Sequence, residues 1–188
     1  MGVLMLERLP IDGVPEVVRL DAGVRYAALV ADPGRARLLA DLVTGLAELP
    51  PGAAVTGDGP VRLVPADGGL LPHLTVLQNL VRAHRLARRQ VPRRRAVEAC
   101  REWAAQCGLD DVARRYPHEL TPGRRRMGGV ARALSSEAEV IVLEDAVGLP
   151  TWATLLNLEH NPDLLGKALL LITPDRERAT GFTELDGA

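Results

Sequence analysis

Short, continuously apolar runs mark the strands that this sequence predicts. The runs at 26–31, 140–143 and 168–172 contain no charged residue, which is typical of strands that are covered on both faces of a parallel sheet. Two weaker strands are predicted at 53–56 and 61–64, on either side of a turn that contains glycine and proline. Strands of this kind that alternate with helices favour an α/β fold.

Helical periodicity accounts for most of the remaining chain. The helices predicted from it cover 35–46, 75–90, 93–107 and 122–135. Thr121 and Pro122 mark the start of the last one, because threonine caps a helix and proline fits its first turn. The two middle helices predict a helical lobe.

The charge balance excludes an overall field that would draw the whole molecule onto DNA or an anionic membrane. The 188 residues include 23 basic and 24 acidic ones, for a net charge of -1. A local cluster of arginines lies within 82–95, and we interpret it as a solvated helix face, with anionic lipid head groups or nucleic acid as the alternative ligands. Because no aromatic residues interleave with these arginines, nucleic acid is not an expected partner.

The sequence also predicts where the protein is located. No apolar run approaches the roughly 20 residues of a membrane-spanning helix, and no basic leader precedes the apolar N-terminal segment. We therefore expect a cytoplasmic protein without direct membrane insertion.

Two cysteines lie in one predicted helix. Cys100 and Cys107 are seven residues apart, roughly 10 Å along a helix axis, so they cannot form a disulfide with each other. We interpret them as core thiols. His84 and His118 do not have metal-ligand spacing with these cysteines, so no metal site is predicted.

The polar turns that follow the apolar strands carry the main functional signal. Asp32-Pro33-Gly34 follows the first such strand, Glu144-Asp145 follows a later one, and Thr173-Pro174-Asp175 follows the next. P-loop NTPases arrange their phosphate and metal contacts in this order.

Longer motifs indicate the type of P-loop protein. They are the segments GLLPHLTVLQNL at 69–80, YPHELTPGRRR at 116–126, EVIVLEDAVGL at 139–149 and LLITPD at 170–175. With these motifs the chain resembles the ATP-binding subunit of an ABC transporter of the bacterial importer type. The resemblance implies a P-loop NTPase-like parallel sheet in a discontinuous α/β core at 1–70 and 121–188, with an inserted helical lobe at 71–120. It also implies ATP hydrolysis with ATP and Mg²⁺ as cofactors. It also implies a partner that is a second ATPase subunit or a membrane permease.

Within this resemblance the phosphate loop falls at 31–38, and the residues there depart from the family pattern. The loop has neither the lysine nor the following hydroxyl, and Asp32 with Pro33 predicts a capped helix start whose carboxylate occupies the anion site. The remaining candidates for phosphate contact are Gly34, Arg35 and Arg37. Surface arginines on a helix are the alternative interpretation.

Other catalytic positions of the family are altered as well. Ala66 stands where the family has a glutamine, and Pro174 stands where it has the switch histidine. Glu144 and Asp145 are the Walker B candidates, but their order is reversed, and the alternative is that both cap or form salt bridges. No aromatic residue precedes Tyr26, so no ring is available there to stack on adenine.

The signature motif departs least from the family pattern. Thr121 keeps the hydroxyl and Gly123 keeps one glycine, whereas Pro122 removes a backbone N–H. The resemblance implies that this motif faces the phosphate loop of a partner subunit. Thr121 and Gly123 are therefore candidates to complete a nucleotide site on that partner.

Together these departures predict a non-hydrolysing pseudo-ATPase that acts through protein association. The expected partner is an ABC ATPase subunit, a membrane permease or a second copy of the chain, at the inner face of the cell membrane. The alternatives are a weakly active transporter ATPase that uses Glu144 and Asp145, and a recruited fold that binds an unrelated ligand. ATP and Mg²⁺ are implied by the resemblance alone, and the altered motifs argue against both.

Overall fold

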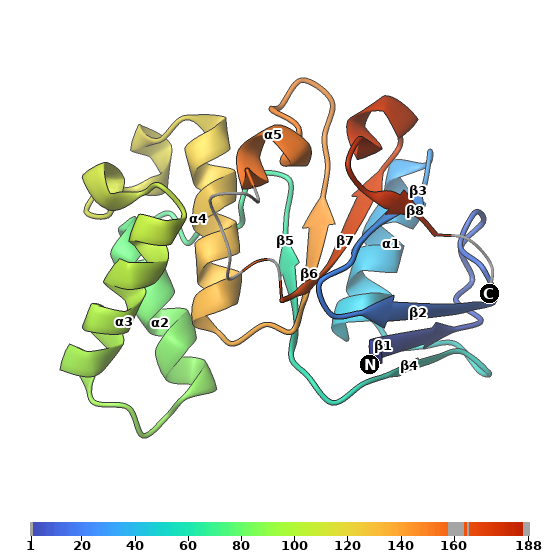
Figure 1. Cartoon of the computed structure of the whole chain (residues 1–188), viewed down its shortest axis with the longest axis horizontal. Coiled ribbons are helices and arrows are strands. Elements are labelled where there is room, and N and C mark those ends of the chain that lie inside the picture. The colour runs from blue at the N-terminus through green and yellow to red at the C-terminus, as the bar shows by residue number, and fades with distance from the viewer. Residues whose placement is uncertain (1, 158–163, 165, 186–188) are drawn as a thin grey trace.

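The strands of the protein form two sheets. A computed structural model describes residues 2–157, 164 and 166–185 (Figure 1). The larger sheet is parallel throughout, in the order β5-β6-β7-β3-β8, and consists of β3 (Arg25–Leu29), β5 (Val61–Val64), β6 (Val140–Glu144), β7 (Ala168–Thr173) and β8 (Thr183–Glu184). The smaller sheet is antiparallel, in the order β2-β1-β4, and consists of β1 (Gly2–Glu7), β2 (Val17–Asp21) and β4 (Ala54–Thr56). The predicted α/β fold with a parallel sheet is confirmed.

Both faces of the parallel sheet are covered, as its apolar strands require. Successive side chains along a strand point to opposite faces. In β6, Ile141 and Leu143 join the core on the side of the helical lobe. Val140 and Val142 join a second core, which also holds residues of α1 (Pro33–Thr44) and of the antiparallel sheet. The sheet thus separates two apolar cores.

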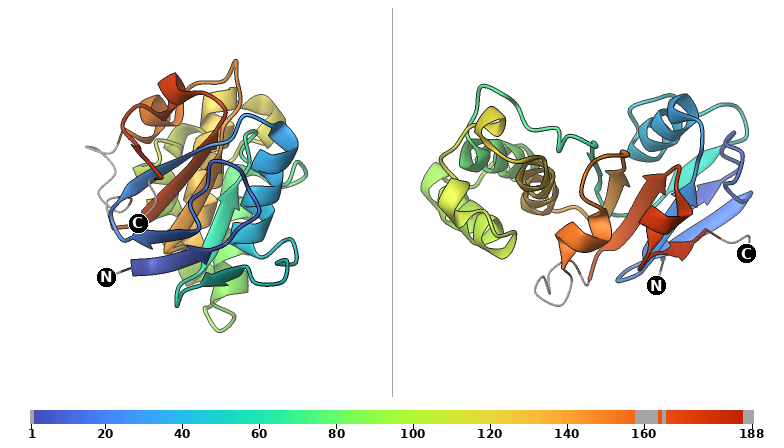
Figure 2. Two further views of the ribbon diagram at one scale, coloured as in Figure 1. Left: turned by 90° about the vertical axis from the view of Figure 1, so that its right-hand side faces the viewer. Right: turned by 90° about the horizontal axis from the view of Figure 1, so that it is seen from above.

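The helical lobe lies at one end of the molecule. It contains α2 (Val76–Ala87), α3 (Arg93–Gln106) and the short 3-10 turns η1 (Asp110–Val112) and η2 (Pro117–Glu119). Helix α4 (Pro122–Ser135) packs on α2, α3 and β5, so it lies between the lobe and the sheet (Figures 1 and 2). After β6 and β7 follow the short helices α5 (Trp152–Leu156) and η4 (Arg176–Ala179). None of the helices in the described residues is long and apolar enough to span a bilayer.

Local sequence determines how the chain enters the lobe. Thr75 caps α2 by accepting a hydrogen bond from the backbone N–H of Gln78 at 3.3 Å, and the Gln78 side chain accepts one from Thr75 at 2.9 Å. The buried amide of Asn79 accepts from the N–H of Leu71 at 2.8 Å and donates to the carbonyl of Leu74 at 3.1 Å. These bonds tie the first residues of the lobe to its first helix.

Both cysteines are buried, as predicted. Cys100 lies on the buried face of α3, and Cys107 follows the end of that helix. Burial raises the pKa of the Cys100 thiol to about 12. Cys100 therefore stays protonated at neutral pH and acts as an apolar core residue.

Three strands, β1, β2 and β8, lie where the apolar runs predict none. In β1, Leu4 and Leu6 are buried while Met5 between them is 37% exposed, so this strand alternates instead of forming a continuous run. The two-residue strand β8 is too short to leave a pattern. The first parallel strand ends at Leu29 and not at Ala31, because the chain turns there toward the start of α1.

Helix α4 comes close to the backbone of the segment that leads to the lobe. A Cβ at Gly129 would lie 2.4 Å from the carbonyl oxygen of Gly68. At the neighbouring Gly128 a Cβ would instead meet the end of the Leu70 side chain, at 2.8 Å. The missing side chain of Gly129 therefore allows the close packing of α4 on this segment.

Replacing Gly129 with alanine is expected to lower the free energy of unfolding by about 1–3 kcal/mol, because the added methyl group meets backbone that cannot move aside. Gly128→Ala is the matched control. The end of Leu70 can rotate away from it, and alanine favours a helix over glycine by roughly 1 kcal/mol. Urea unfolding curves measure both variants, and equal losses for the two would contradict the close approach at Gly129.

Candidate functional site

The carboxyl ends of three neighbouring parallel strands open on one cavity. Strands β3, β7 and β6 are adjacent, and ligands of α/β proteins bind at this edge of the sheet. The cavity has a volume of about 390 Å³. Its lining includes Pro33, Arg37, Ala66, Glu144, Asp145 and Pro174. The structure thus brings the segments that resemble the phosphate loop, Walker B and the switch loop together, whereas the candidates Gly34, Arg35, Thr121 and Gly123 do not line this cavity.

The helix start at the cavity holds a carboxylate of the protein itself. Asp32 is the N-cap of α1 and accepts a hydrogen bond from the backbone N–H of Arg35 at 2.8 Å, as the sequence predicts. Pro33 is the first helical residue and has no N–H to offer. The Arg35 guanidinium forms an ion pair with Asp12. A Cβ at Gly34 would lie 3.2 Å from the Asp32 carboxylate, so the cap is packed against this glycine.

Arg37 joins two carboxylates at the cavity. Its guanidinium donates to Asp41, one turn further along α1, and to Glu144, at 3.1 Å in each case. The hydrogen bond to Asp41 is the main cause that raises the pKa of Arg37. Burial raises the pKa of Glu144, although Arg37 and a hydrogen bond from the backbone of Ala66 oppose this shift. The charge of Arg37 is therefore neutralised within the protein.

Asp145 is held more tightly than Glu144. Its side chain is 1% exposed. One carboxylate oxygen accepts from Arg178 at 2.8 Å and from Arg126 at 3.2 Å, and the other accepts from the Thr173 hydroxyl at 3.0 Å. Burial alone would raise the pKa of Asp145, but the hydrogen bonds from Arg178 and Thr173 outweigh burial and lower it. Asp145 is therefore ionised at neutral pH.

Arg126 reaches this carboxylate from α4 and is fully buried. It also donates to the carbonyls of Glu144, at 3.3 Å, and Pro150. Its guanidinium carbon lies 4.0 Å from the centroid of the Trp152 ring, close enough for a cation–π contact. Burial lowers the pKa of Arg126, and the hydrogen bond to Asp145 opposes that effect. The contacts of Arg126 thus connect α4 with the end of β6 and with α5.

The residues of the signature-like segment lie at the start of α4. Thr121 is the N-cap, and its hydroxyl accepts from the N–H of Arg124 at 3.4 Å. The Arg124 side chain forms an ion pair of 2.6 Å with Asp111. Thr121 is exposed, and a Cβ at Gly123 would lie 3.1 Å from the end of the Leu155 side chain.

Sequence reasoning missed Arg126, Arg178 and Trp152 as site residues. It left two interpretations of the Walker B carboxylates, and in the structure both carboxylates form salt bridges. One signal marks Arg126, because it lies four residues before Val130 on the buried face of α4. A charged residue in that position requires a buried partner. Arg178 carries no comparable signal.

The groups at this cavity do not fit Mg²⁺ and a nucleotide phosphate. Magnesium requires oxygen ligands that face the ion, but the carboxylate oxygens of Glu144 and Asp145 accept hydrogen bonds from arginines. The helix N-terminus that would bind an anion is occupied by Asp32. Within the described ranges, no three His, Cys, Asp or Glu side chains are grouped so that they could hold a metal ion.

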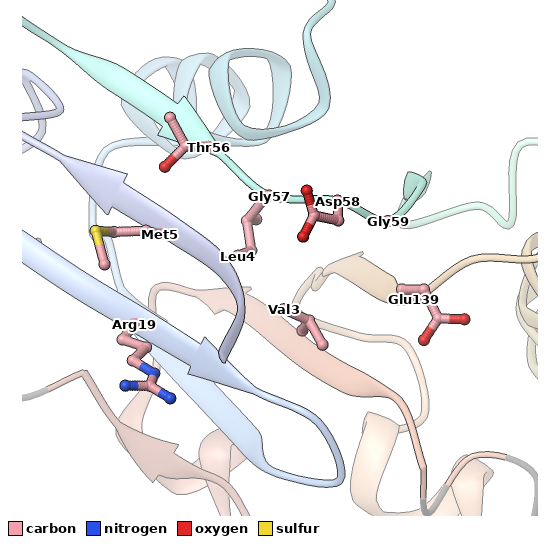
Figure 3. Close-up of a pocket in the computed structure, with 9 residues that line it drawn as sticks. All are labelled: Val3, Leu4, Met5, Arg19, Thr56, Gly57, Asp58, Gly59 and Glu139. Carbon is pink, nitrogen blue, oxygen red and sulfur yellow. The ribbon is translucent and has the colours of Figure 1, made fainter. Parts of the chain in front are cut away.

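A second cavity lies beside the antiparallel sheet and is larger, at about 470 Å³ (Figure 3). Met5 and Arg19 line it from neighbouring strands. Asp58 and Glu139 also line it, but in Figure 3 the Glu139 side chain points away from Asp58, and Glu139 pairs with Lys167 at 3.0 Å. None of the sequence candidates lies here.

The fold and the convergence of the three segments on one cavity define a P-loop NTPase-like domain with an inserted helical lobe. Solved structures agree with this class. An inward-facing ABC transporter superposes with a TM-score of 0.74 and 19% sequence identity, covering 97% of this chain and 77% of the other. A nucleotide-free ATP-binding cassette from an ABC transporter gives a TM-score of 0.74 at 15% identity, covering 97% and 85%.

Curated proteins of similar sequence are ATP-binding proteins of uptake and import systems. The glycine betaine uptake system ATP-binding protein YehX of Escherichia coli is 32% identical over 121 residues, which are 62% of this chain and 39% of the relative. The spermidine/putrescine import ATP-binding protein PotA of Hahella chejuensis is 27% identical over 176 residues, covering 92% and 44%. The chain therefore has the fold of an ABC-transporter ATP-binding domain and is similar in sequence to importer subunits. It spans less than half the length of these relatives, and no protein-family model matches it.

Replacing Asp145 with alanine is expected to lower the free energy of unfolding by about 3–5 kcal/mol at neutral pH, because the change leaves Arg126 buried without its charged partner. Asp111→Ala, which breaks an exposed ion pair with Arg124, is the matched control and should leave stability unchanged within error. Urea unfolding at several pH values measures both.

The stabilisation by Asp145 should also depend on pH. Its folded-state pKa is lowered from an ordinary value of 3.8, so the difference between wild type and Asp145→Ala should be constant well above that pH. It should shrink as the pH falls below 3.8 and through the folded-state pKa. A difference that grows on acidification would contradict an ionised Asp145.

Proposed function

We propose that this domain is a non-hydrolysing member of the ABC ATP-binding type, which keeps the fold and has lost the nucleotide chemistry. The observation that carries the proposal is the closed charge network of the cavity. It consists of two clusters of ion pairs, Arg37 with Asp41 and Glu144, and Asp145 with Arg126 and Arg178. Across the two clusters three positive charges match three negative ones, so together they offer a phosphate no net attraction.

The same network argues against a catalytic base. A general base needs to reach the water that it activates and works best with a pKa near the working pH. Asp145 is 1% exposed and has a lowered pKa. The carboxylate of Glu144 lines the cavity but is bound to Arg37. A nucleotide that recruited Arg37 would leave Glu144 and Asp41 without their cation and close to its own negative charge.

The proposed role is therefore association with another protein at the inner, cytoplasmic face of the cell membrane. The importer relatives suggest an ABC ATPase subunit or a membrane permease as the partner, and a second copy of the chain is a further possibility. Thr121 at the exposed start of α4 is available to a partner subunit. We assign the discontinuous ATPase-like α/β core to 1–70 and 121–188 and the helical subdomain, a candidate docking surface, to 71–120.

An assay of phosphate release from ATP in the presence of Mg²⁺ tests the proposal. The wild-type chain and Glu144→Gln are expected to give the same rate as a protein-free blank, because neither Walker B carboxylate acts as a base. Arg19→Gln, a change at an exposed pair in the antiparallel sheet, controls for preparation quality. A Mg²⁺-dependent rate in the wild type that falls in Glu144→Gln but not in Arg19→Gln would establish the weak ATPase instead.

A further inference from the structure

The helical lobe carries a concentration of positive charge that no contact described above uses. Between Asp67 and Glu98 the sequence holds seven arginines and no carboxylate, although the net charge of the chain is -1. Two of these arginines are neutralised, Arg88 by Glu137 and Arg94 by Glu98. In the part of the chain that the structure describes, five have no ion-pair partner, namely Arg82, Arg85, Arg89, Arg93 and Arg95.

These five arginines are exposed and lie near one end of the lobe. The turn between α2 and α3 forms the lower tip of the lobe in Figure 1. Arg85 lies in the last turn of α2, and Arg93 and Arg95 lie in the first turn of α3. Positive charge at a helix start is opposed by the helix dipole, so Arg93 and Arg95 add no stability to α3 through the dipole. Their position at the start of the helix therefore favours binding to an anion outside the protein.

An exposed apolar residue lies among these arginines. Leu86 is 65% exposed. With Arg82, Arg85 and Arg93 it lines a groove of about 570 Å³ between α2 and α3, whose other walls include Val81 and Val97. Arg82, Arg85, Leu86 and Arg93 line this groove, and Arg89 and Arg95 lie beside it near the turn between α2 and α3. These six residues, here called the Arg-Leu face, combine cationic and apolar groups.

We propose that the Arg-Leu face docks the domain on an anionic phospholipid surface. The inference deepens the proposed function and rests on it, because it supplies the contact for the proposed position at the membrane. Each arginine that comes near an anionic bilayer strengthens binding by about fivefold. An apolar side chain among these cations enters the boundary between head groups and acyl chains.

The arrangement favours a membrane over a protein segment or a nucleic acid. A helical segment of a partner would occupy the groove, but Arg89 and Arg95 are not among the residues that line it. A bilayer surface, in contrast, is broad enough to contact the tip of the lobe and the rim of the groove at the same time. Single-stranded nucleic acid is bound by aromatic stacking as well as by charge, and the sequence from 68 to 97 has no aromatic residue apart from two histidines.

Cosedimentation of the full chain with vesicles tests the proposal. One set of vesicles contains phosphatidylcholine alone and the other contains phosphatidylcholine with phosphatidylglycerol. We expect binding to the anionic vesicles alone, weakened by added salt. Arg85→Gln with Arg93→Gln should weaken it by about 25-fold, from two charges at roughly fivefold each. Leu86→Ser should weaken it several-fold.

Matched controls lie on the α/β core. Arg19→Gln with Arg176→Gln removes the same two charges from exposed pairs, and Leu46→Ser changes a leucine that is 66% exposed. Both should bind vesicles as the wild type does. The inference is overturned if the folded wild type does not bind anionic vesicles, or if core and lobe variants lose binding equally. Binding of RNA or of an acidic polypeptide in preference to the vesicles would overturn it as well.

The vesicle assay contains no nucleotide, so its outcome is separate from that of the phosphate-release assay. If the chain releases no phosphate and does not bind vesicles, only the proposal of lipid docking is overturned. A chain that binds vesicles through the Arg-Leu face but hydrolyses ATP overturns only the pseudo-ATPase assignment.

Discussion

The buried charge of Asp145 is the constraint on which the arrangement of this domain depends. Taking a carboxylate out of water is costly unless hydrogen bonds and opposite charges compensate for it. Here the compensation comes from Arg126 on α4, Arg178 in η4 and Thr173 at the end of β7. Because each partner belongs to a different element, the requirement to satisfy Asp145 also fixes how α4 and η4 sit against the sheet edge.

The arginines and carboxylates that pair at the cavity cannot stabilise the fold and bind a ligand at the same time. A nucleotide site needs donors and carboxylate oxygens that are held in place and face the cavity, whereas here arginines and carboxylates face one another. Asp32 repeats this pattern at the start of α1, where it takes the hydrogen-bond position of an anion. The fold does not depend on the chemistry of the cavity, since the two apolar cores lie on either side of the sheet and pack whatever the cavity binds.

Features that depend on neighbouring residues were predictable from the sequence, and features that depend on distant pairs were not. The parallel strands and the caps at Asp32 and Thr121 arise from local patterns. The pairs that Asp145 makes with Arg126 and Arg178 join residues that are 19 and 33 positions apart. Only the fold reveals them, because each arginine lies in a segment with several other charged residues.

Calorimetric titration of the purified chain with ATP and Mg²⁺ tests the closed charge network most directly. If the arginines and carboxylates are engaged with one another, the titration gives no binding heat and the melting temperature does not change. A ligand that binds only the folded state stabilises it by about 2.7 kcal/mol at a hundredfold excess over Kd. Binding heat together with a Mg²⁺-dependent rise in melting temperature would contradict the account.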